Sequence, residues 1–162
     1  MIQIGERVPD TMFGVIRADG PGRLPGREVF AGRTVVLFGV PGAFTSTCSE
    51  VHLPDFLARA GDLKAAGADV VACVAVNDAE VLHAWARQRG AGDHVKMLAD
   101  GSADFARAAG LDIDLSRLGM GTRLRRFAAI VVDGVVRHLA VEEGPGVSVS
   151  SAEPTLEALR TL

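Results

Sequence analysis

Residues 34–50 read TVVLFGVPGAFTSTCSE, and the interpretation of the whole chain starts from this stretch. Residues 34–40 form a nearly continuous apolar run, which is typical of a strand covered on both faces. Pro41 and the glycine after it favour a turn, and the Thr-Ser-Thr run that follows favours the start of a helix. The stretch therefore predicts a buried strand, a tight loop and a helix whose first turn contains Cys48.

Cys48 is the first candidate for a chemical role. A helix N-terminus has unpaired backbone N–H groups and roughly half a positive charge, so it stabilises an anion. The anion that a cysteine supplies is its thiolate, which is the nucleophile of thiol chemistry. The alternative is a small buried hydrophobic side chain, the commoner state of a free cysteine. Because Cys48 follows a strand, a Pro-Gly turn and a hydroxyl-rich loop, we interpret it as a redox or nucleophilic centre.

Hydrophobic spacing and turn residues place the other elements. An extended segment around residues 12–16 is followed by a Gly- and Pro-rich loop over residues 20–27. The helix that begins near Cys48 is expected to reach about residue 66, with a kink at Pro54. Further strands are expected at 69–76 and 95–98, helices between 78 and 90 and at 102–109 and 153–162, and a hairpin at 127–141 that turns at Asp133-Gly134.

This order of elements predicts an α/β fold. The early strands alternate with helices and the last strands form a hairpin, so we expect a mixed central sheet with helices on both faces. A chain of 162 residues with an apolar fraction of 48% fits one domain, spanning residues 1–162.

Composition narrows the class of function. A net charge of −3 gives no electrostatic basis for binding nucleic acid or an anionic membrane. No apolar run reaches the length of about 18 residues that a membrane span needs. Residues 1–7 lack the regions of a signal peptide, and two cysteines do not make a disulfide scaffold. We therefore expect a cytoplasmic protein, and no Cys/His spacing indicates a metal site.

Thr45 and Pro41 each have two interpretations. Thr45 lies three residues before Cys48, so its hydroxyl either caps the helix or hydrogen-bonds the thiolate and an incoming oxygen. Pro41 either shields the sulfur from water and fixes the loop, or simply ends the strand. The residue types alone do not separate these roles.

Three further positions have open alternatives. Arg126 directly precedes the strand of the hairpin, but periodicity does not choose between it and its neighbours Arg123 and Arg125. His52 lies one helical turn after Cys48 and either orients an arginine or a loop, or is a satisfied buried histidine, which we favour. Cys73 lies in mid-strand, and we interpret it as an inert thiol because reaching Cys48 would distort a central strand.

Pro41, Thr45 and Cys48 form the pattern Pro-x-x-x-Thr-x-x-Cys, which resembles the active-site motif of peroxiredoxins. Over residues 41–56 the longer string Pro-Gly-Ala-Phe-Thr-x-x-Cys-Ser-x-x-His-Leu-Pro-x-Phe is similar to the peroxiredoxin 5 (type II) subfamily. Similarity continues in further blocks over nearly the whole chain, at residues 71–78, 84–85, 119–123, 126–127 and 133–134.

The resemblance implies a thioredoxin-like fold, a homodimer and a thiol-dependent peroxidase that uses no metal or organic cofactor. It matches Cys48 to the peroxidatic cysteine, Thr45 to the hydroxyl that positions peroxide, Pro41 to the shielding proline and Arg126 to the activating arginine. Some members of the subfamily have a resolving cysteine near the C-terminus, but residues 146–151 of this chain contain none. A one-cysteine cycle is therefore expected.

In the predicted reaction the Cys48 thiolate attacks hydrogen peroxide or an organic hydroperoxide and becomes a sulfenic acid. This requires the sulfur to lie in a cleft that admits ROOH. An external thiol, from glutaredoxin with glutathione or from thioredoxin, then reduces Cys48. Two other readings are a non-catalytic redox sensor or adaptor that signals through oxidised Cys48, and a cysteine hydrolase or acyl-transferase. The hydrolase needs a positioned histidine base, for which His52 is poorly placed.

Overall fold

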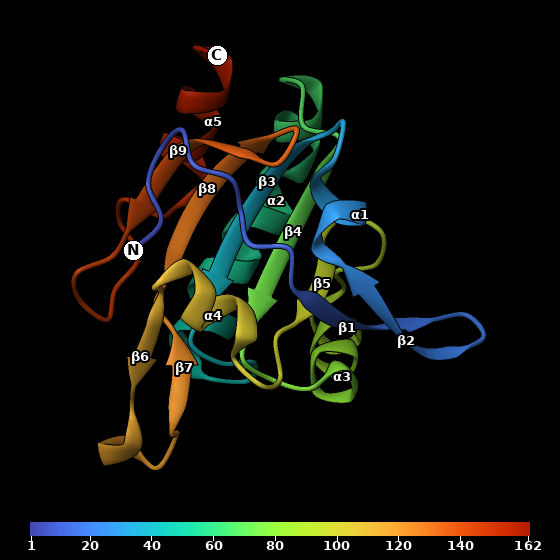
Figure 1. The fold of residues 1–162 in the computed structure, drawn as a ribbon, viewed down its shortest axis with the longest axis vertical. Coiled ribbons are helices and arrows are strands. Elements are labelled where there is room, and N and C mark those ends of the chain that lie inside the picture. Colours follow the sequence, from blue (N-terminus) through green and yellow to red (C-terminus); the bar gives the residue numbers. More distant parts are fainter.

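The computed structural model describes residues 1–162, which form a central sheet of seven strands (Figure 1). The strands lie in the order β2-β1-β5-β4-β3-β8-β9. Their bounds are β1 (Met12–Arg17), β2 (Gly20–Pro25), β3 (Thr34–Val40), β4 (Val70–Ala75), β5 (Lys96–Ala99), β8 (Phe127–Val132) and β9 (Val135–Val141).

The sheet is mixed, as predicted. β3 is parallel to β4, and β4 is parallel to β5, because a helix connects each of these pairs. β8 and β9 form the predicted hairpin and add antiparallel to the other side of β3. The carboxyl end of β3 therefore lies beside the start of β8, and this neighbourhood contains the candidate site.

Helices cover both faces of the sheet, which confirms the predicted α/β class. One core cluster joins the sheet to α2 (Leu53–Ala65), α3 (Ala79–Arg89) and α5 (Ala152–Arg160). The other cluster joins the opposite face to α1 (Gly26–Phe30) and α4 (Asp104–Ala109). No helix has both the length and the apolar character needed to cross a membrane.

The N-terminal region differs from the prediction. Residues 20–27, expected as a loop, form strand β2 and the start of α1. β2 pairs with β1 only and lies at the edge of the sheet, where Pro21 and Pro25 need no backbone donor on the outer side. A second, small hairpin, β6 (Asp112–Asp114) with β7 (Thr122–Leu124), encloses the 3-10 turn η2 (Ser116–Leu118) and was not predicted.

The helix after Cys48 also has a different form. Residues 48–52 make a π-helical turn, η1 (Cys48–His52), and α2 begins at Leu53. The N–H of Leu53 donates to the carbonyl of Cys48, which is the wider spacing of a π-turn. Pro54 thus lies in the first turn of α2, where a proline without an N–H is tolerated. In place of the predicted kink, the chain changes helix type.

Candidate active site

Cys48 lies in the first helical turn after β3, as predicted. The first backbone bond of this helix runs from the N–H of Ser49 to the carbonyl of Thr45, at 2.9 Å. The N–H groups of the residues before Ser49 therefore precede the intrahelical ladder and contribute the positive end of the helix. The Cys48 side chain has no exposed surface.

Arg126 reaches the sulfur because of the strand register. Gly39 pairs with Phe127, so the residue before Phe127 lies beside the carboxyl end of β3. A Cβ at Gly39 would come within 2.2 Å of the Phe127 ring, so only glycine lets the two strands pack this way. The Arg126 side chain is 6% exposed, and its Nη2 donates to Sγ of Cys48 at 3.2 Å.

His52 holds the other side of the guanidinium. Its ring is fully buried, Nε2 lies 2.9 Å from the carbonyl oxygen of Ser150, and Nδ1 lies 3.0 Å from Nη1 of Arg126. A carbonyl can only accept and a guanidinium can only donate, so the proton of the neutral ring is on Nε2 and Nδ1 accepts. The favoured prediction of a merely satisfied buried histidine was therefore incomplete, because His52 also contacts Arg126.

Acid should destabilise the protein through His52. Burial lowers the pKa of His52 from 6.5 to about 4, the Arg126 charge acts in the same direction, and the bond to Ser150 opposes them. As the pH falls, the unfolded chain binds a proton at His52 before the folded protein does. The contribution of neutral His52 to stability is therefore full above pH 6.5 and falls as the pH drops toward 4. We expect a loss of about 2 kcal/mol in unfolding free energy between about pH 7 and pH 5. Urea denaturation at several pH values measures the unfolding free energy of the protein and of His52→Gln. If this free energy depended on pH equally in both proteins, the prediction would be contradicted.

Thr45 and Pro41 are placed differently from one another. The Thr45 hydroxyl donates to the carbonyl of Gly42 at 2.6 Å, so it neither caps the helix nor bonds the sulfur in this structure. The tight turn after β3 presents that carbonyl to the hydroxyl. Because the hydroxyl donates, the lone pairs of its oxygen stay free. Pro41 is partly buried, and its carbonyl accepts from Nη1 of Arg123 at 3.3 Å.

Arg123, which the sequence offered only as an alternative to Arg126, also lies at the candidate site. Besides Pro41, its guanidinium donates to the carbonyl of Val76 at 3.3 Å, so it joins the loops that follow β3 and β4. Asn77 reinforces this junction, because its side chain accepts from the N–H of Ala43 at 2.9 Å. The only sequence signal was the position of Arg123 in one of the blocks of family similarity.

Cys73 lies in β4 and is fully buried, and both cysteines are free. Burial raises the pKa of the Cys73 thiol well above its ordinary value, so this thiol stays protonated. These observations agree with the interpretation of Cys73 as a packing residue.

Access to the sulfur differs from the prediction. We expected the sulfur to lie in a cleft that admits ROOH, but Cys48 is completely covered. A hollow of about 880 Å³ lies along β1, α3 and the start of β5, and neither Cys48 nor Arg126 lines it. Nor does the structure gather three or more histidine, cysteine or acidic side chains that could hold a metal ion.

Known proteins resemble this chain along nearly its full length. The family model described as Redoxin matches residues 3–156. Peroxiredoxin-2C of Oryza sativa is 44% identical, with 98% of each chain covered, and the chloroplastic peroxiredoxin-2E-2 of the same plant is 47% identical, with 98% of this chain and 72% of the relative covered. The chain belongs to the peroxiredoxin family.

Solved structures agree with this membership. Reduced Prx3 of Vibrio vulnificus in complex with hydrogen peroxide is 45% identical, covers 98% of this chain with 99% of its own, and superposes with a TM-score of 0.94. Peroxiredoxin 5 of Alvinella pompejana is 29% identical, covers both chains fully and has a TM-score of 0.88. The thioredoxin-like fold is thereby confirmed, and this peroxiredoxin is a thiol-dependent peroxidase that acts on peroxide with a thiol reductant.

Proposed function

We propose that Cys48 is the residue that reduces the peroxide and that Arg126 and Thr45 bind the substrate. The observation that carries this proposal is the 3.2 Å contact between Nη2 of Arg126 and Sγ of Cys48 in a fully buried setting. The thiolate attacks one peroxide oxygen, an S–O bond forms and the O–O bond breaks. The sulfur is oxidised to a sulfenic acid, and the departing RO⁻ takes a proton and leaves as water or an alcohol.

Arg126 acts chiefly on the transition state in this proposal. A thiolate becomes less nucleophilic as its basicity falls, so ionisation alone gives a limited gain in rate. A fixed guanidinium in a water-poor site instead stabilises the negative charge that develops on the breaking O–O bond. Nε of Arg126 is buried and has no hydrogen-bond partner, so this N–H is available to a peroxide oxygen.

Thr45 supplies the complementary group. Its hydroxyl proton is engaged by Gly42, so its oxygen can only accept, and the O–H of a hydroperoxide is the donor that fits. The peroxide would then lie between a donor, Arg126, and an acceptor, Thr45. Pro41 and Thr45 are both partly exposed and precede the buried Cys48, so we place the entry path beside them and assign Pro41 the shielding role.

We further propose that the enzyme is of the peroxiredoxin 5 (type II) subfamily and follows a one-cysteine cycle. The string over residues 41–56 supports the subfamily. Ser150, in the segment where a resolving cysteine occurs in some relatives, is a buried serine, and Cys73 lies within a central strand. The sulfenic acid is then reduced by an external thiol, either glutaredoxin with glutathione or thioredoxin.

Cys73→Ser should leave turnover nearly intact, within about twofold, because an inert core thiol takes no part in the cycle. Steady-state peroxide consumption with glutaredoxin and glutathione, and separately with thioredoxin, measures this and identifies the donor. Loss of turnover with both donors, in a variant whose unfolding temperature is unchanged, would instead make Cys73 the resolving cysteine.

Assembly and location remain proposals that rest on the resemblance and on the free thiols. We propose a homodimer, which sedimentation velocity would contradict if only the monomer mass were found at micromolar concentration.

We also propose a cytoplasmic location, since both cysteines are free. Fractionation of cells that express the natural gene would test it.

A further inference from the structure

Glu142, directly after β9, has an unusual number of hydrogen bonds for one side chain. Its carboxylate accepts from the backbone N–H groups of Ser148 and Ser150, at 2.7 and 2.8 Å, and from their hydroxyls, at 2.9 and 2.6 Å. Only 9% of Glu142 is exposed. Burial alone raises its pKa, but these four bonds outweigh burial and hold the pKa of Glu142 well below its ordinary value. The carboxylate therefore stays charged and fixes residues 148–150.

This segment belongs to a closed ring of hydrogen bonds that includes the candidate site. The Ser150 carbonyl accepts from Nε2 of His52, and Nδ1 of His52 accepts from Nη1 of Arg126. The ring closes through the backbone, because the N–H of Glu142 donates to the carbonyl of Arg126 at 2.9 Å. Both ends of Arg126 are thus connected to Glu142.

We propose that Glu142 is a positioning residue for peroxide reduction, acting through the Ser150 carbonyl, the tautomer of His52 and the orientation of Arg126. The inference rests on the proposed function of Arg126. With the carbonyl fixed, His52 keeps its proton on Nε2 and offers a lone pair to the guanidinium. If the Ser150 carbonyl is not fixed, the tautomer with the proton on Nδ1 of His52 becomes accessible. This tautomer places an N–H against an N–H of Arg126. Two donors repel, so the guanidinium would leave its contact with Cys48.

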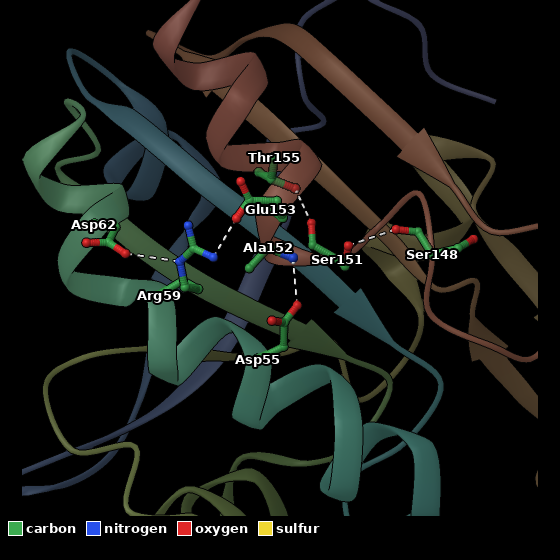
Figure 2. A network of polar contacts seen from close by, with 8 residues as sticks. All are labelled: Asp55, Arg59, Asp62, Ser148, Ser151, Ala152, Glu153 and Thr155. Carbon is green, nitrogen blue, oxygen red and sulfur yellow. Dashed lines mark hydrogen bonds and ion pairs between the residues drawn. The ribbon is translucent and has the colours of Figure 1, made fainter.

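The start of α5 has separate anchors, which provide a matched control. Figure 2 shows Asp55 of α2 accepting from the N–H of Ala152, and Arg59 between Asp62 and Glu153. The Asp55–Ala152 and Arg59–Glu153 contacts attach α5 to α2, the Arg59–Asp62 pair lies within α2, and none of the three touches the Ser150 carbonyl. Glu153→Ala should therefore lower stability at the same corner of the molecule and leave His52 unchanged.

The test compares Glu142→Ala, Glu142→Gln and Glu153→Ala with the unmodified protein. Long-range ¹H–¹⁵N spectra of the reduced protein report the tautomer of His52, and stopped-flow mixing with hydrogen peroxide gives the rate constant for Cys48 oxidation. In Glu142→Ala we expect loss of the pure Nε2–H tautomer and a fall of about tenfold or more in that rate constant, because small displacements of a catalytic group have large effects.

Glu142→Gln should largely keep both the Nε2–H tautomer of His52 and the rate constant for Cys48 oxidation. Its amide oxygen can accept at the position of Oε2, and its NH₂ can donate to the Ser148 hydroxyl, which is able to accept. Glu153→Ala should match the unmodified protein in tautomer and in rate constant.

A Glu142→Ala protein that is folded and keeps both the Nε2–H tautomer and the rate constant would overturn the inference. So would a Glu153→Ala protein that loses both to the same extent, since the effect would then be general loosening. If Glu142→Ala does not fold, Glu142→Asp, which keeps the charge but withdraws it by one methylene, takes its place with the same criteria. The spectra require no peroxide, so failure of the unmodified protein to react would contradict the proposed function while the tautomer still tests the ring.

Discussion

Cys48→Ser should abolish peroxide reduction, leaving only the background reaction between peroxide and the reductant. A serine hydroxyl is not ionised at neutral pH and is a poor nucleophile without an adjacent base. His52 cannot serve as that base, because its lone pair on Nδ1 is engaged by Arg126 and its other nitrogen donates to Ser150. The expected loss is therefore complete within the detection limit of a peroxide-consumption assay.

The control for this variant is Cys73→Ser, which makes the same change in the same core cluster. Each substitution buries a hydroxyl in place of a thiol, so the unfolding temperatures of both variants are measured alongside activity. Residual turnover in Cys48→Ser that disappears in the double variant would assign the chemistry to Cys73 and refute the proposed mechanism.

Arg126→Ala should reduce the rate constant for Cys48 oxidation by about 10²- to 10³-fold, the usual cost of removing one donor that stabilises developing charge. The thiolate fraction should fall by a smaller factor. Stopped-flow fluorescence can follow the oxidation, because the single tryptophan, Trp85, donates from its indole N–H to Ser49, the neighbour of Cys48. Alkylation by iodoacetamide, whose transition state makes no use of the peroxide site, measures the thiolate.

Arg125→Ala is the matched control, since it removes the same charge one residue away, from a side chain for which the structure shows no hydrogen bond or ion pair. It should change neither rate by more than about twofold, as is usual for surface substitutions. Equal losses of oxidation and alkylation in Arg126→Ala would show that the guanidinium only promotes ionisation of the thiol.

Much of the fold was predictable because its signals are local. The run 34–40 is apolar since β3 is buried on both faces, and Asp133-Gly134 turns the hairpin with positive φ at both residues. Asp78 and Gly90 bound α3 as expected, the first by accepting from a backbone N–H and the second in the left-handed conformation. The edge strand β2 was missed because a stretch rich in glycine and proline occurs in edge strands as well as in loops.

The placement of the residues from Pro41 to Cys48 between a strand and a helix was predictable for the same reason. Pro41, Thr45 and Cys48 lie within eight positions of one another between a strand and a helix, and the family motif spans them. The acceptor of the Thr45 hydroxyl was not predictable, because the geometry of the turn places the Gly42 carbonyl within its reach. Nor was the complete cover over Cys48, which depends on how the surrounding segments pack.

The sequence by itself determined the element order, the α/β class and a cysteine in the first turn of a helix, because neighbouring residues specify each of these. Among the three arginines, family resemblance selected Arg126, and only the antiparallel register of β8 against β3 places it at the sulfur. The ring from Glu142 through Ser150 and His52 joins residues up to 98 positions apart. Such contacts are decided by the packing of η1, β9 and the C-terminal loop around a common core, and no spacing along the chain encodes them.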